Sequence, residues 1–66
     1  MPVISVDLFP GKTRAQKREF VAAVTAAAVE HLGVEAEGVI VLLRETPAEN
    51  WGWSGRLFTA GTSATE

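Results

Sequence analysis

The first twelve residues, MPVISVDLFPGK (residues 1–12), decide how the rest of the chain is organised. Residues 3–9 alternate in a way that is typical of a half-buried β-strand, and the Pro-Gly pair after them ends the run. One face of this strand carries three apolar side chains, Ile4, Val6 and Leu8. The stretch therefore predicts that the fold begins with a strand, whose apolar face packs against the next elements of the chain.

The second residue, Pro2, gains chemistry of its own once Met1 is removed. Its nitrogen then becomes a free secondary amine that acts as a base or a nucleophile. An apolar or cationic site lowers the pKa of such an amine, because both disfavour the ammonium form. Chain-end amines have a reference pKa of about 7.7–8, so a modest downward shift leaves the amine mostly neutral at pH 7. The alternative is that a proline at this position serves methionine removal alone.

Residues 14–32 are predicted to form a helix. Thr13 offers an N-cap, Gln16 completes a capping box, and Gly33 stands where a C′ glycine belongs. The apolar residues expected to face the sheet share a stripe at helical spacing: Phe20, Val24, Ala27, Ala28 and Leu32.

The second strand is predicted from the continuous apolar run of residues 39–43, which suits a strand covered on both faces. Strand, helix and strand in this order form a βαβ unit, with parallel strands joined by a right-handed crossover. Residues 51–58 contain two tryptophans and two glycines and indicate a short turn or hairpin. The expected fold is therefore a single α/β (α+β) domain over residues 1–58, followed by a flexible tail at residues 59–66.

The chain is too short to be stable by its own core. It has 66 residues, and a chain of this size buries only about 60% of its unfolded surface. It has no cysteine, and the lone His31 with scattered carboxylates predicts no metal site. Since an isolated two-stranded sheet is marginal, the sequence predicts self-association through the sheet.

Charge and hydropathy exclude several classes of partner. The net charge of −2 gives no reason to expect nucleic acid. The longest apolar runs are far shorter than the roughly 20 residues of a membrane span, and a leader pattern is missing. We therefore expect a soluble, cytoplasmic protein without a membrane partner.

The order of these features resembles the 4-oxalocrotonate tautomerase family. The resemblance covers roughly residues 1–58, and its most specific parts are the proline after Met1 and the stretch ENWGWSG at residues 49–55. It implies the tautomerase fold, in which dimers share a four-stranded sheet and three dimers form a hexamer. It also implies a cofactor-free isomerase that acts on small carboxylates of the 2-hydroxydienoate or 2-oxo acid type.

The resemblance assigns roles to individual residues. Pro2 corresponds to the family's general base, which moves a proton between the enol oxygen and a carbon. Lys12 stands where the family usually has arginine, and it keeps the charge but loses the planar fork that binds a carboxylate. Trp51 matches an aromatic residue that closes the pocket, and Phe9 is expected to line it. The alternative for Lys12 is a solvated cation without a binding role. The alternative for Trp51 is a role in packing alone.

Ile40 is the main departure from the family pattern, because it stands where a second arginine is usual. An isoleucine cannot bind a second carboxylate, which puts a dicarboxylate such as 2-hydroxymuconate in doubt as the substrate. Arg14 and Arg44 are possible substitutes. Arg44 lies four residues beyond Ile40, about 13 Å along a strand, so we expect it to be remote from its own Pro2 and able to serve only the site of a neighbouring subunit. It is expected mainly as a charged strand end, paired with an acid.

Two other functions remain open at this stage. The same proline serves hydratases, dehalogenases and decarboxylases of the superfamily, but Trp53 occupies the region where those enzymes want a carboxylate. The other is a non-catalytic protein, or one subunit of a mixed assembly whose partner supplies the arginine missing at Ile40.

Overall fold

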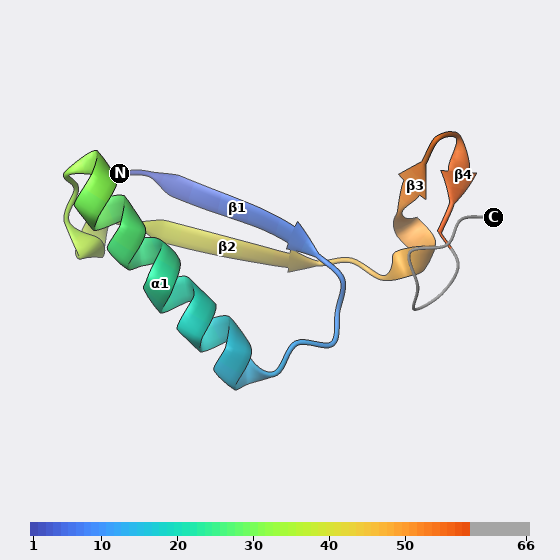
Figure 1. Cartoon of the computed structure of the whole chain (residues 1–66), viewed down its shortest axis with the longest axis horizontal. Helices are drawn as coiled ribbons and strands as arrows, with labels where there is room; N and C mark the ends of the chain where they lie inside the picture. The colour runs from blue at the N-terminus through green and yellow to red at the C-terminus, as the bar shows by residue number, and fades with distance from the viewer. Residues whose placement is uncertain (59–66) are drawn as a thin grey trace.

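The computed structural model describes residues 1–58, which form a βαβ unit followed by a hairpin (Figure 1). The elements in chain order are β1 (Val3–Leu8), α1 (Arg14–Leu32), a 3₁₀ turn (Ala36–Gly38), β2 (Ile40–Glu45), a second 3₁₀ turn (Ala48–Asn50), β3 (Gly52–Trp53) and β4 (Arg56–Leu57). The predicted fold class and element order are confirmed. The predicted tail at residues 59–66 lies outside the described residues.

Strands β1 and β2 run in parallel, with Val3 opposite Ile40 and Leu8 opposite Glu45. The Ile40 N–H donates to the Pro2 carbonyl at 3.0 Å, which fixes the two strand starts side by side. Strand β2 begins one residue later than predicted, because the Val39 N–H donates back to the preceding 3₁₀ turn. It also runs past the apolar stretch, since its last two residues still pair with the end of β1.

Both ends of α1 lie where the sequence places them. The Thr13 hydroxyl accepts from the Gln16 N–H at 3.1 Å, and the Gln16 side-chain oxygen accepts from the Thr13 N–H at 2.9 Å. Gly33 ends the helix at φ 67°, a left-handed conformation that glycine adopts without a Cβ clash. The predicted capping box and C′ glycine are confirmed.

The face that α1 turns to the sheet shares only Val24 and Ala28 with the predicted stripe. The inward residues are Val21, Val24, Thr25 and Ala28. Ala28, at 5% exposed, is the one buried residue in the described part of the chain, whereas Phe20 and Leu32 remain 43% and 63% exposed and Ala27 is also exposed. Two strands offer a narrow surface that covers only one stripe of the helix, so the neighbouring apolar side chains stay outside.

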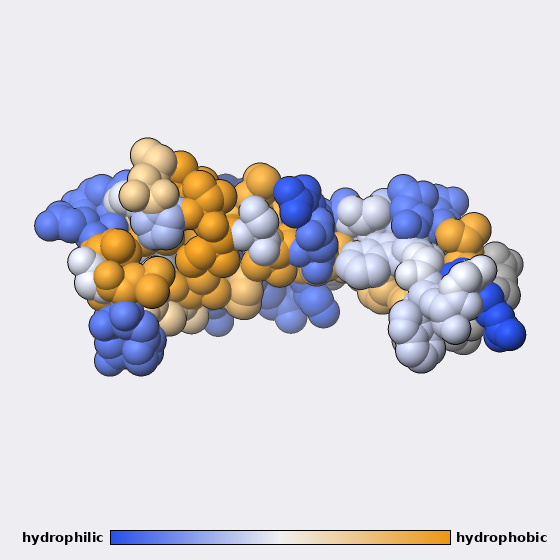
Figure 2. All heavy atoms as spheres, turned by 90° about the horizontal axis from the view of Figure 1, so that it is seen from above, coloured by the Kyte–Doolittle hydropathy of each residue, from blue (hydrophilic) through white to orange (hydrophobic). Residues whose placement is uncertain are grey.

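The sheet is covered on one side only. Ile4, Val6, Val41 and Leu43 are half-buried on the side of α1. The other side, called the open face here, consists of exposed residues: Val3, Ser5, Asp7, Ile40, Leu42 and Arg44. A single chain therefore leaves one face of β2 uncovered, as expected for two strands and one helix, and its coverage on both faces stays a prediction about the assembly. Apolar atoms gather over the βαβ part, while the hairpin end is more mixed (Figure 2).

The predicted hairpin is present as β3 and β4, joined by the two residues Ser54 and Gly55. Both have positive φ, 56° and 78°, as the tight hairpin turn with the twist of the strands requires. Within residues 1–58, no helix is long and apolar enough to cross a membrane.

Candidate active site

Pro2 lies at the head of β1, half-buried, with its carbonyl held by the Ile40 N–H at 3.0 Å. The nearest pair on the open face is Val3 opposite Ile40, which are 58% and 45% exposed. The Pro2 nitrogen is an amide as long as Met1 is attached, and a free amine without it. This end of the sheet, called the amino end below, therefore combines a candidate base with apolar surroundings.

Three aromatic rings meet just beyond the other end of the strands, and we call them the aromatic cluster: Phe9, Trp51 and Phe58. The rings of Phe9 and Trp51 meet edge to face, with centroids 4.7 Å apart, and Phe58 lies 6.0 Å from Phe9. The Trp51 indole N–H donates to the Thr46 carbonyl at 2.9 Å, and the Phe58 N–H donates to the Trp51 carbonyl at 2.9 Å. These contacts fix the hairpin against the end of the sheet.

Phe58 was not among the residues predicted for the site. It lies three positions after Gly55, directly after β4, the strand that returns from the turn. A hairpin of that length brings the chain back to its starting point, so the turn signal in the sequence was sufficient to find it.

Lys12 is exposed in the connection between β1 and α1. With Gln16 and Lys17 it lines an apolar cavity of about 320 Å³ between the first turns of α1 and the sheet, whose other walls are Val6, Leu8, Phe20 and Leu43. The cavity shows that α1 alone does not fill the space above the carboxyl end of the sheet.

The predicted site residues fall into two groups in one chain. Pro2 and Ile40 are at the amino end, whereas Phe9 and Lys12 follow the carboxyl end of β1 in the chain and Trp51 follows that of β2. The six residues of β1 separate the groups by about 20 Å at 3.3 Å per residue. The structure therefore brings Phe9 together with Trp51, but it does not bring either of them to the Pro2 of the same chain.

Arg44 pairs with Asp7 across the two strands. Its Nε donates to one carboxylate oxygen at 2.8 Å and its Nη2 donates to the other at 3.0 Å. The hydrogen bond from Arg44 holds the pKa of Asp7 below its ordinary value, and the same contact raises the pKa of Arg44. The expected charged strand end, paired with an acid and remote from its own Pro2, is thus present.

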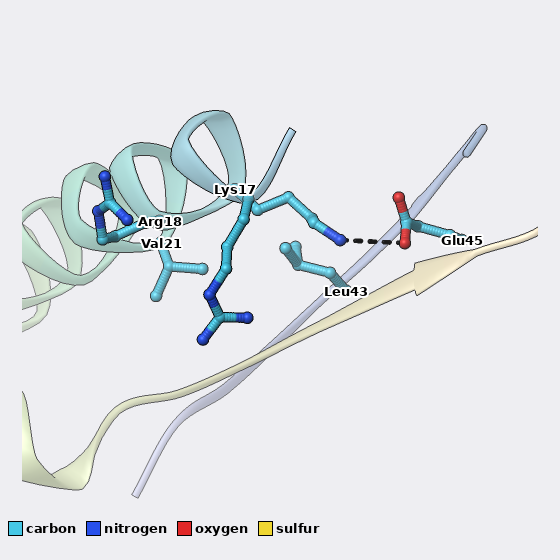
Figure 3. A pocket seen from close by; sticks show the side chains of 6 residues that line it. Lys17, Arg18, Val21, Leu43 and Glu45 are labelled. Carbon is cyan, nitrogen blue, oxygen red and sulfur yellow. Dashed lines mark hydrogen bonds and ion pairs between the residues drawn. The ribbon is translucent and has the colours of Figure 1, made fainter. Parts of the chain in front are cut away.

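Arg14 lies at a second cavity of about 450 Å³, on the flank of α1. The cavity is lined by Arg14, Lys17, Arg18, Val21, Leu43 and Glu45. Lys17 reaches from the helix to Glu45 at 3.1 Å (Figure 3). Arg14 is therefore placed with the cations near the carboxyl end of β2, away from the amino end.

Comparison with known proteins identifies the family to which the sequence is similar. The pattern of the tautomerase family, described as "Tautomerase enzyme", matches residues 2–61. A probable tautomerase of Ralstonia nicotianae is 42% identical over 83% of this chain and 79% of its own length. The 2-hydroxymuconate tautomerase of Pseudomonas putida is 38% identical over 83% of this chain and 87% of its own length.

Solved structures agree with the sequence comparison. TomN, a 4-oxalocrotonate tautomerase homologue in the tomaymycin biosynthetic pathway, superposes with a TM-score of 0.80 at 41% identity, covering 85% of this chain and 86% of its own. YwhB, another homologue of 4-oxalocrotonate tautomerase, superposes with a TM-score of 0.81 at 30% identity, covering 85% and 92%. The chain therefore belongs to the tautomerase family, and it is an isomerase of the 4-oxalocrotonate tautomerase type.

Proposed function

We propose that this isomerase is a cofactor-independent tautomerase that uses the Pro2 amine, freed by removal of Met1, as its general base. It moves a proton between the enol oxygen and a carbon of a 2-hydroxydienoate or 2-oxo acid. The observation that carries the proposal is the position of Pro2 at the head of β1, beside exposed apolar side chains. Its support from relatives is that several of them are named 2-hydroxymuconate tautomerases.

The chemistry requires a neutral amine and a held substrate. In an assembly that covers Val3 and Ile40, these apolar side chains would favour the neutral form of the Pro2 nitrogen, because hydrocarbon solvates an ammonium poorly. That nitrogen takes the proton from the enol oxygen and returns it to the carbon. Lys12 binds the substrate carboxylate or the developing enolate oxygen, and the rings of Phe9 and Trp51 exclude water.

The proposed site needs more than one copy of the chain. A small acid is much shorter than the roughly 20 Å between Pro2 and the aromatic cluster of the same chain. A neighbouring copy whose carboxyl end meets this amino end closes that distance. The exposed apolar side chains of the open face, together with the unfilled cavity beside Lys12, give such copies a surface to cover. We propose a homohexamer built from three dimers, in the cytoplasm.

Pro2→Ala tests the proposed base. We expect wild-type protein to turn over an enol such as phenylenolpyruvate or 2-hydroxymuconate. We expect Pro2→Ala to reduce kcat/KM about 10²–10⁴-fold, the usual contribution of a general base. The loss should lie toward the lower limit, because the substituted alanine still carries a primary amine after Met1 is removed. The assay follows the enol absorbance, and circular dichroism with light scattering confirms that the variant keeps its fold and assembly.

The outcomes separate the proposed functions. Undiminished kcat/KM in an intact Pro2→Ala assembly would show that another group is the base. No turnover by the wild type would favour the mixed assembly, in which a second chain supplies the arginine that Ile40 replaces. That reading then requires a second tautomerase-like chain to copurify with this one.

A further inference from the structure

We propose that this site selects enols with a single carboxylate and an apolar or aromatic substituent, and that Ile40 sets this preference. The inference rests on the proposed function, since it concerns the substrate that reaches the Pro2 amine. It follows from where the structure places charge along the open face.

The amino end of the open face carries no charge. Its first pair is Val3 and Ile40, and the next pair along is Ser5 and Leu42. The first charged pair, Asp7 with Arg44, is five residues beyond Pro2, about 16 Å along the strand. A substrate that reacts at Pro2 therefore meets hydrocarbon from this chain, with Ile40 held beside Pro2 by the backbone hydrogen bond of 3.0 Å.

Arg44 of this chain lies at the far end of the strands, and in a neighbouring copy that brings its carboxyl end to this site Arg44 still pairs with its own Asp7. Two hydrogen bonds, of 2.8 and 3.0 Å, tie its guanidinium to Asp7, and releasing it would leave the Asp7 carboxylate without its partner. Lys17 is paired with Glu45 by a single contact of 3.1 Å. Among the described cations, those without an ion pair to another described residue are Lys12, Arg14, Arg18 and Arg56. None of these four belongs to either strand of the open face.

The opposite wall of the site, supplied by the aromatic cluster, is equally short of polar partners. The Trp51 indole N–H is already used by the Thr46 carbonyl, so the cluster presents ring surface rather than a donor. Lys12, three residues after Phe9 in the chain, is the cation left for one carboxylate. A second carboxylate between Ile40 and these rings would lose its hydration without gaining a partner, whereas a phenyl group gains contacts there.

The experiment compares phenylenolpyruvate, a monocarboxylate, with 2-hydroxymuconate, a dicarboxylate, each rate being divided by the uncatalysed rate of the same enol. On wild type we expect the normalised kcat/KM for the monocarboxylate to equal or exceed that for the dicarboxylate. Ile40→Arg should raise the ratio of dicarboxylate to monocarboxylate about 10–100-fold, the gain of one charge-assisted hydrogen bond. Ile40→Gln is the matched control, because it is polar without the charge, and it should leave that ratio within a few-fold of wild type.

A wild type that prefers the dicarboxylate tenfold or more would overturn the inference while leaving the proposed tautomerase intact. The same holds if Ile40→Arg assembles normally, as judged by light scattering, and leaves the ratio unchanged. If Ile40→Arg does not assemble, the inference is tested on wild type and Ile40→Val instead. Both should then prefer the monocarboxylate, and a preference for the dicarboxylate in either would contradict the inference. Failure of the proposed function is distinct, because neither enol is then turned over.

Discussion

Protein that retains Met1 should turn over enols at least about 10²-fold more slowly than protein that begins at Pro2, which is the lower limit for losing a general base. With Met1 attached, the Pro2 nitrogen is part of a peptide bond, and its lone pair is delocalised into the carbonyl. It therefore has no basicity to offer. Strand pairing is not affected, because the first hydrogen bond of the sheet uses the Pro2 carbonyl rather than its nitrogen.

The two forms are best compared within one preparation. A cleavable extension placed before Pro2 keeps the Pro2 nitrogen in a peptide bond. Proteolytic removal of the extension then releases the free amine. Intact mass spectrometry reports the fraction processed, and initial rates should rise in proportion to that fraction. The control is an extension of equal length at the other end of the chain, which should not change the rate. Full activity with methionine retained throughout would end the amine-base mechanism.

Two impaired variants should recover part of the wild-type activity when they share one assembly. Lys12→Ala should lose about 10–100-fold in kcat/KM, the effect of one charge-assisted hydrogen bond to the carboxylate, and Pro2→Ala should lose more. If Pro2 and Lys12 of one site come from different copies, random mixing leaves about a quarter of the sites with both residues intact. Refolding the two variants together should then recover roughly that fraction of wild-type activity.

Activity is recovered in the mixed assembly only if Pro2 and Lys12, at opposite ends of β1 in one chain, come from different copies. If Pro2 and Lys12 of the same chain formed the site, the mixed assembly would contain no intact site and would show no gain over the separate variants. Mixing the folded variants without dissociation is the control and should also give no gain. Light scattering accompanies the test, and a folded monomer at micromolar concentration would contradict the shared site directly.

Features that depend on neighbouring residues could be predicted from the sequence. The capping box of Thr13 and Gln16 and the left-handed Gly33 each need only a few residues, so the bounds of α1 were correct. The alternation in β1 placed Ile4, Val6 and Leu8 on the covered side for the same reason.

Features that depend on packing could not be predicted with the same success. The inward face of α1 is set by the width of the sheet it meets, so Phe20 and Leu32 were expected inside and are exposed. The partner of Arg44 depends on the register of two strands, which the sequence did not specify residue by residue. The roles assigned to Pro2 and Lys12 remain proposals, because a site shared between copies is only partly present in one chain.

The most direct test of the central claim is a titration of the Pro2 nitrogen, followed by ¹⁵N NMR in processed protein and set beside the pH dependence of kcat/KM. A base must be unprotonated to act, so kcat/KM should rise with pH as the ammonium loses its proton and level off above its pKa. We predict that the NMR and kinetic midpoints coincide and lie below about 7.7–8, the ordinary range for chain-end amines. A Pro2 nitrogen that stays protonated across the pH range of full activity would contradict the account.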